Sequence, residues 1–154
     1  MNSLVVYTNN PATADFLEAK RPEITVKWLA STSIDVLAAT RTALNKGAVL
    51  LSDPMAGTRG TLPLFASVPA AARISSPGNR GMINPFMSLL IVSQPGGMLD
   101  FMSVKRLDET IGQYKKNAKS RFIRHNDDAI RNFQISDVEN LAAALSAHEQ
   151  KNIF

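Results

Sequence analysis

The stretch SLVVYTNNP, residues 3–11, passes from an apolar, β-branched run into residues that favour the start of a helix. The apolar run predicts a buried first strand over residues 3–7 that ends in a turn. Asn10 can accept hydrogen bonds from the free amides of a helix start, and Pro11 suits the first helical position because its missing N–H costs nothing there. We therefore predict a short helix over residues 12–20.

The next segments repeat this alternation of strand and helix. EITVKWL, residues 23–29, alternates apolar and polar side chains, which predicts an edge strand with one polar face. Thr32 or Ser33 can cap a second helix that ends at Gly47, and the apolar residues 48–51 predict a third strand. Short connections between such elements favour a parallel sheet with right-handed crossovers.

These three strands lead to a specific prediction of topology, in which Val5, Val26 and Leu50 lie on adjacent parallel strands. A fourth strand is predicted over residues 86–93, before a Pro-Gly-Gly turn. Its orientation is left open, because the connection that precedes it need not contain a crossover helix.

Helices are predicted for the rest of the chain. Apolar residues at helical spacing predict a long amphipathic helix over residues 104–122. Asp127 and Asp128 would open another helix, and Ser136 with Glu139 has the pattern of a capping box at the start of a C-terminal helix. The predicted fold class is α/β: a single three-layer domain over residues 1–154, with a small, mostly parallel sheet of about four strands flanked by helices, and with C-terminal helices.

Composition limits the possible classes of function. The chain has 154 residues, of which 45% are hydrophobic and 19% charged, as expected for one globular domain. It contains no cysteine, so thiol nucleophiles, redox pairs and Cys-ligated metal sites are excluded. The N-terminus lacks the pattern of a signal peptide, and no apolar run is long enough to span a membrane. We therefore expect a cytoplasmic protein with no membrane association.

The connection over residues 58–83 is predicted to be a long loop insertion. Loops of this length inside a compact domain usually have a functional role. Four apolar side chains on or beside it have no evident core position, and we expect them to be exposed: Met55, Leu64, Phe65 and Met82. Exposed apolar surface commonly marks association, so we expect a homodimer or a docked protein partner that uses this loop.

Polar side chains follow three of the predicted strands, where α/β proteins commonly bind ligands. The candidate segments are Thr8-Asn9-Asn10, Ser52-Asp53 and Ser93-Gln94. If the strands are parallel, these segments meet at one edge of the sheet. The alternative is that Asn10 is a helix cap, that Asp53 and Ser93 stabilise turns, and that nothing binds there.

An uncompensated set of arginines follows the third strand. Between Asp53 and Asp100 there is no acidic residue, whereas Arg59, Arg73 and Arg80 lie there, two of them directly before a glycine. A guanidinium group binds phosphate or carboxylate through a bidentate fork. Arg59 and Arg80 are therefore predicted to bind a small anion together with the strand-end residues, although arginines kept for solubility would give the same pattern. The phosphate-binding glycine fingerprints are absent.

Other kinds of site find no support in the sequence. The two histidines, His125 and His148, lack the spacing of a catalytic metal site, so we expect neither metal nor cofactor. No GxSxG motif is present, so nucleophilic acyl transfer is not indicated. The basic run over residues 115–125 lies in the last turns of a predicted helix, where cations favour the helix dipole. We therefore do not expect a nucleic-acid partner.

Five segments follow one another along the chain: VVYTNNP, KGAVLLSDPMAG, NPFMSLLIVS, LDFMSVKRLDETI and RNFQISDVENL. They resemble the succession found in the GrdX family, small proteins associated with glycine, sarcosine and betaine reductase systems. The resemblance covers residues 5–57 and 84–145. Two departures are that the loop after Gly57 is longer here and that family members tend to carry a histidine or another polar residue at the position of Asp53.

The resemblance implies an accessory role, since glycine reductase chemistry runs through thiol and selenol groups that this chain lacks. Our first hypothesis is a non-catalytic accessory or binding protein whose functional surface consists of Asn9, Asn10, Ser52, Asp53 and the loop that carries the arginines. The alternative is a small enzyme or sensor that binds an anionic metabolite, with Asp53 as the base and an arginine as the anion clamp. A second proton-transfer group near Asp53 would favour the enzyme.

Overall fold

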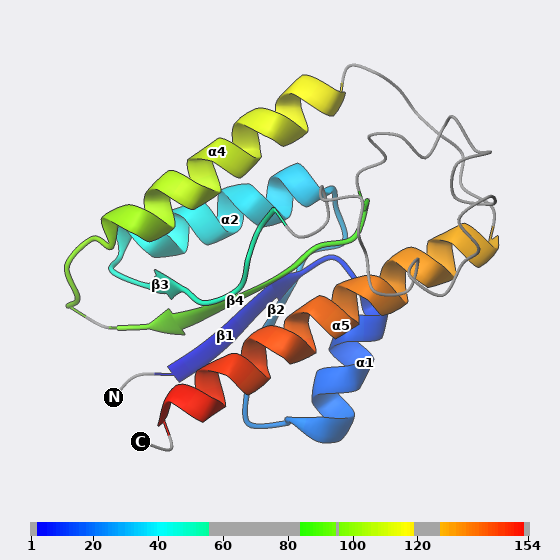
Figure 1. The fold of residues 1–154 in the computed structure, drawn as a ribbon, viewed down its shortest axis with the longest axis horizontal. Helices are drawn as coiled ribbons and strands as arrows, with labels where there is room; N and C mark the ends of the chain where they lie inside the picture. Colours follow the sequence, from blue (N-terminus) through cyan, green and yellow to red (C-terminus); the bar gives the residue numbers. More distant parts are fainter. Residues whose placement is uncertain (1–2, 56–83, 95, 119–126, 153–154) are drawn as a thin grey trace.

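The computed structural model describes residues 3–55, 84–94, 96–118 and 127–152 (Figure 1). Within these ranges the strands and helices alternate along the N-terminal third and are followed by one strand and two long helices. In chain order they are β1 (Ser3–Thr8), α1 (Pro11–Lys20), β2 (Thr25–Trp28), α2 (Ser33–Asn45), β3 (Val49–Leu50), β4 (Ser88–Ser93), α4 (Phe101–Ala118) and α5 (Asp127–Asn152).

The four strands form one mixed sheet in the order β2-β1-β4-β3. β1 and β2 are parallel, whereas β4 is antiparallel to both β1 and β3. The prediction of a mostly parallel sheet is therefore wrong, since two of the three pairings are antiparallel. The chain enters β4 at the edge of the sheet where it left β3, and a strand that starts at that edge has to run in the opposite direction.

The predicted order of strands is correct for one pair and wrong for the other. Val6 lies beside Val26 in the parallel pair β1–β2, as the crossover through α1 predicts. Leu50 pairs instead with Ile91, because β4 lies between β1 and β3. β4 is the most buried of the four strands, and its residues Leu89, Leu90 and Ile91 are fully buried. A strand with apolar side chains on both faces is best accommodated at the centre of a sheet.

Helices cover both faces of the sheet and give the predicted three-layer α/β architecture (Figure 1). On one face, α2 and α4 pack on a core that contains Leu89 and Ile91 of β4. On the other face, α1 and α5 pack on a core that contains Val6 and Leu90. The alternation of side chains along a strand thus sends successive residues of β4 into two different cores. No helix in the described ranges is both long enough and apolar enough to span a membrane.

Local capping signals explain the N-terminal helices. The Asn10 side chain accepts a hydrogen bond from the Ala12 amide at 3.0 Å, and Pro11 takes the first helical position, as predicted. Thr32 caps α2 by accepting from the Asp35 amide at 3.3 Å. Beyond α2, Gly47 has a φ of +100°, a left-handed conformation that favours glycine.

The C-terminal region differs from the prediction of two helices. α5 is one continuous helix that starts at Asp127, and Ser136 lies buried in its interior rather than at a cap. The sequence over residues 127–152 contains neither proline nor glycine, so nothing interrupts the helical hydrogen bonds. A serine and a glutamate at capping-box spacing therefore do not start a helix here.

Candidate functional site

The candidate site lies at the edge of the sheet where β1 ends and β4 begins, which we call the Thr8–Ser88 edge after the two residues paired there. The prediction that Ser93 and Gln94 also lie at this edge is wrong. Because β4 is antiparallel to β1, Ser93 pairs with Ser3 at the opposite edge. Ser88, the first residue of β4, takes the place expected for Ser93.

Asn9 connects three segments at this edge. Its side-chain amide donates to the carbonyl oxygens of Ser31 at 3.0 Å and Pro85 at 3.1 Å. Its side-chain oxygen accepts from the Met87 amide at 2.8 Å. These bonds fix the end of β1 against the start of α2 and the start of β4. The side chain of Asn9 is thus used within the fold.

Asn10 and Thr8 are also engaged in internal hydrogen bonds. The Asn10 amide group donates to the Gln134 carbonyl oxygen and to Oδ2 of Asp137, both at 3.0 Å, while its oxygen caps α1. The Thr8 hydroxyl lies 3.0 Å from the Met87 carbonyl oxygen and accepts from the Asn10 amide at 2.9 Å. Both side chains are fully buried. The structure thus brings three predicted residues together, with their side chains directed into the protein.

A carboxylate that the sequence analysis did not single out lies at the centre of this network. Oδ2 of Asp137 on α5 accepts hydrogen bonds from Ser88 at 2.5 Å, Asn10 at 3.0 Å and Thr13 at 3.3 Å. The Ser88 hydroxyl also lies 2.7 Å from the hydroxyls of Thr8 and Thr13. We call Asp137, Asn10, Thr13, Ser88 and Thr8 the Asp137 cluster. It joins β1, β4, α1 and α5.

The electrostatics of the cluster are set by its burial. Burial raises the pKa of Asp137, while the hydrogen bonds from Ser88, Asn10 and Thr13 lower it, and the net direction is upward. Each of these hydroxyls has one proton. Ser88 can donate its proton to Asp137, and its lone pairs can accept from Thr8 or Thr13 when those protons are not donated to the Met87 carbonyl oxygen and to Asp137, respectively. The neutral donors thus compensate the buried charge in part.

Two buried hydroxyls have no hydrogen-bond partner in the part of the chain that the structure describes: those of Tyr114 and Ser136. Burial raises the pKa of Tyr114, and the charge of Asp137 raises it further. The phenol therefore stays protonated over the physiological range. A buried hydroxyl without a hydrogen-bond partner destabilises the folded state, so each of these two groups should lower the free energy of unfolding.

Ser52 and Asp53 follow β3 and behave differently from each other. The Ser52 hydroxyl is buried and accepts from the Leu90 amide at 2.9 Å, two residues along β4 from the Ser88 position. Asp53 is exposed, and its carboxylate accepts from the Met55 amide at 2.9 Å in a local turn. Asp53 faces away from the buried Ser52, because successive residues of an extended chain point to opposite sides.

Several predictions concern residues 56–83, which lie outside the described residues. They include the roles of Arg59 and Arg80 and the exposure of Leu64, Phe65 and Met82. Of the four apolar residues expected to be exposed, the structure describes Met55, which is half-buried. The anion-binding role of the two arginines stays a prediction.

One sequence signal could have identified Asp137. Phe133, Asp137, Leu141 and Leu145 are spaced four residues apart, so they share one face of α5. Phe133, Leu141 and Leu145 are core residues, and a carboxylate at the remaining position of an apolar stripe predicts a buried, hydrogen-bonded charge. The capping-box pattern of Ser136 and Glu139 predicts a helix start at these residues instead of a buried carboxylate at Asp137.

Chemically, the Asp137 cluster has one ionisable carboxylate surrounded by neutral donors. The described residues contain no group of three or more metal-ligating acidic or histidine side chains.

Comparisons of the chain with protein-family models, with curated proteins and with solved structures found no match.

Proposed function

We propose that this protein is a non-catalytic accessory protein that acts by binding another protein, in the manner of the GrdX type, in glycine reductase-type amino-acid metabolism. The resemblance of five sequence segments to that family supports the metabolic setting. The observation that carries the proposal is the internal use of the polar side chains at the Thr8–Ser88 edge. The side chains of Asn9, Asn10 and Ser52 form hydrogen bonds within the protein, so they stabilise the fold rather than contact a ligand.

The Asp137 cluster supports the absence of catalysis. General acid–base catalysis needs a second proton-transfer group within hydrogen-bond reach of the first. The described side chains that hydrogen-bond to Asp137 are two hydroxyls and an amide, none of which titrates in the physiological range. The neighbouring phenol of Tyr114 has its pKa raised, which removes it further from that range.

Purified glycine reductase components provide the test. Sedimentation velocity of the chain mixed with each component should show a complex with at least one of them. Reductase turnover should be measured with and without the chain, and the chain alone should convert neither glycine nor sarcosine nor betaine. Turnover by the chain alone that is lost in Asp137→Asn would refute the non-catalytic role. Failure to bind any component would refute the accessory role.

The alternative is a small enzyme or sensor that binds an anionic metabolite, and it depends on Arg59 and Arg80. The favouring observation is the run of sequence between Asp53 and Asp100, which carries arginines and no acidic residue. The buried carboxylate of Asp137 opposes an anion at the described part of the edge. Phosphate, sulfate and acetate should be titrated while the thermal unfolding midpoint is followed. The alternative requires a stabilisation that is lost in Arg59→Ala and Arg80→Ala.

A further inference from the structure

The connection from β4 to α4 exposes a concentrated apolar surface. Met98 is 90% exposed and Phe101 74% exposed, and more than half of Leu99 and of Met102 is exposed. Four of the six large hydrophobic residues exposed in the described ranges lie in this five-residue stretch. We call Met98, Leu99, Phe101 and Met102 the apolar tip. It lies at the end of the sheet opposite to the Thr8–Ser88 edge, where β4 finishes.

The backbone that carries the apolar tip is firmly held. A Cβ atom on Gly47 would lie 2.4 Å from the Gly97 carbonyl oxygen, so the turn after α2 packs tightly against the residue before Met98. The Asp100 carboxylate caps α4 by accepting from the Ser103 amide at 3.1 Å and from its hydroxyl. That hydroxyl in turn accepts from the Leu50 amide at 2.9 Å. The tip is therefore presented on a preorganised backbone, which lowers the entropic cost of binding.

Three basic residues flank the tip. Lys105 and Arg106 follow Phe101 and Met102 by four residues on α4, so each lies one turn away on the same helix face, and both are exposed. Lys46 is exposed next to Gly47, whose backbone touches Gly97. Within the tip, the carboxylate of Asp100 is engaged in the cap.

The nearest acidic residues along α4 lie beyond the basic ones. Asp108 is paired with Arg41 through a 2.9 Å contact, and Glu109 is exposed. The exposed charged side chains next to the apolar tip along α4 are thus basic.

We infer that the apolar tip docks into an apolar pocket, rimmed by carboxylates, on a partner protein. The inference rests on the proposed function, and it names the surface and the partner chemistry for that function. An apolar centre with a charged rim is the usual anatomy of a protein interface, and aromatic and methionine side chains are enriched there. Opposite charge on the partner would speed association and fix its register.

Two other occupants fit the observations less well. A second copy of this chain in a twofold dimer would bring the same patch of both copies together, and with it two sets of the basic residues Lys46, Lys105 and Arg106, whose like charges would repel. A lipid surface would attract the basic residues, but insertion of the tip would carry the Asp100 carboxylate toward the hydrocarbon, which is costly. A carboxylate-rimmed protein pocket pairs the basic residues with opposite charge, and a protein, unlike hydrocarbon, can offer polar groups to the Asp100 carboxylate.

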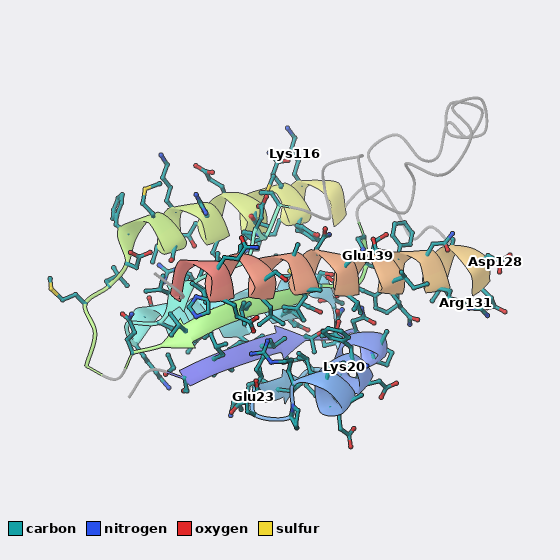
Figure 2. The ribbon with its side chains drawn as sticks, turned by 60° about the horizontal axis from the view of Figure 1, so that its bottom comes forward. Lys20, Glu23, Lys116, Asp128, Arg131 and Glu139 are labelled. Carbon is teal, nitrogen blue, oxygen red and sulfur yellow. The ribbon has the colours of Figure 1, made fainter. Side chains whose placement is uncertain are left out.

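The test measures affinity for the glycine reductase component that the native chain binds. The double variant Met98→Ser/Phe101→Ser removes apolar contacts, and Lys105→Glu/Arg106→Glu reverses the rim charge. Each should weaken binding by at least about tenfold. The matched controls are Ile135→Ser, an exposed apolar residue on α5, and Lys116→Glu, near the other end of α4 (Figure 2). Both controls should change the affinity by less than about twofold.

The outcomes separate the two proposals. If the native chain binds a component and the tip variants bind it equally well, the tip inference is wrong and the accessory role stands. If the native chain binds no component, the accessory role is refuted and the tip inference with it. Tip-dependent dimerisation in sedimentation, or tip-dependent binding to phosphatidylserine vesicles, would also overturn the inference, in favour of a second copy or a membrane.

Discussion

Replacing Asp137 by asparagine removes the one ionisable group of the Asp137 cluster while preserving the shape of the side chain. The amide oxygen can take the place of Oδ2, which accepts from Ser88, Asn10 and Thr13. The variant therefore changes charge more than packing. It tests whether burial of this carboxylate makes the stability of the fold depend on pH.

The direction in which stability changes with pH follows from the pKa of Asp137, which burial raises in the folded protein. Between the pKa of the unfolded chain, near 4, and the higher folded value, the folded protein holds a proton that the unfolded chain has lost. The contribution of Asp137 to stability is therefore complete below the unfolded pKa, and it is lost as the pH rises through the folded pKa. One proton gives a slope of at most about 1.4 kcal/mol per pH unit.

Urea unfolding followed by circular dichroism at intervals from pH 4 to pH 8 measures this effect. The free energy of unfolding of Asp137→Asn relative to the native chain should increase as the pH rises, whatever the difference between the two proteins at pH 4. Asp15→Asn, at an exposed position of α1, is the matched control and should run parallel to the native chain. Parallel curves for the native chain and Asp137→Asn would refute the claim that the buried carboxylate is destabilised by its surroundings.

Three further predictions concern stability and use the same urea measurement. Gly47→Ala should lower the free energy of unfolding by about 1–3 kcal/mol, because it strains a left-handed backbone and drives a Cβ atom into Gly97. Gly112→Ala, in open space on α4, should instead raise it by about 0.5–1 kcal/mol, and equal effects at the two glycines would contradict the packing argument. Tyr114→Phe removes a buried, unpaired hydroxyl and should leave stability unchanged or raise it by up to about 2 kcal/mol; a clear loss would mean that the hydroxyl has a partner. Asn9→Ala should cost at least about 2 kcal/mol, since it leaves the buried Met87 amide and two part-buried carbonyl oxygens without their partner, and a cost near zero would mean that its hydrogen bonds are replaced by water.

The features predicted well from the sequence are those determined within a few residues. The cap of α1 by Asn10, the cap of α2 by Thr32 and the left-handed turn at Gly47 each depend on a side chain and amides close to it in the chain. Such signals act in the same way in any fold. The alternation of strands and helices could therefore be predicted, together with the three-layer α/β class.

The order of the strands depends on contacts between distant residues, and it could not be predicted in the same way. Thr8 contacts Met87, 79 residues further along the chain. The direction of β4 depends on the edge at which the chain returns to the sheet, and its central place depends on the packing of its side chains into the cores on both faces of the sheet. The sequence shows that residues 88–93 are apolar, but it does not show on which side of β1 they lie.

The candidate site illustrates the same limit. Thr8, Asn9 and Asn10 do meet at the end of β1, as predicted, yet their directions are set by partners that no local pattern reveals. Asn10 contacts Asp137 across 127 positions of sequence. A polar side chain at a strand end can face a ligand or complete a buried network, and composition does not distinguish the two. The four-residue spacing of Asp137 within an apolar stripe was the available signal for the second case.

Substitutions at the two ends of the sheet should therefore have different effects. At the Thr8–Ser88 edge, polar side chains converge on Asp137 and join β1, β4, α1 and α5, so a substitution there should act first on folding. At the opposite end, the apolar tip leaves Met98 and Phe101 exposed on a backbone held by Gly47 and Asp100, so a substitution of these side chains should spare the fold and act on association. Exposed apolar side chains contribute little to the stability of an isolated chain and can contribute strongly to an interface. Their concentration in five residues is the observation on which the proposed docking rests.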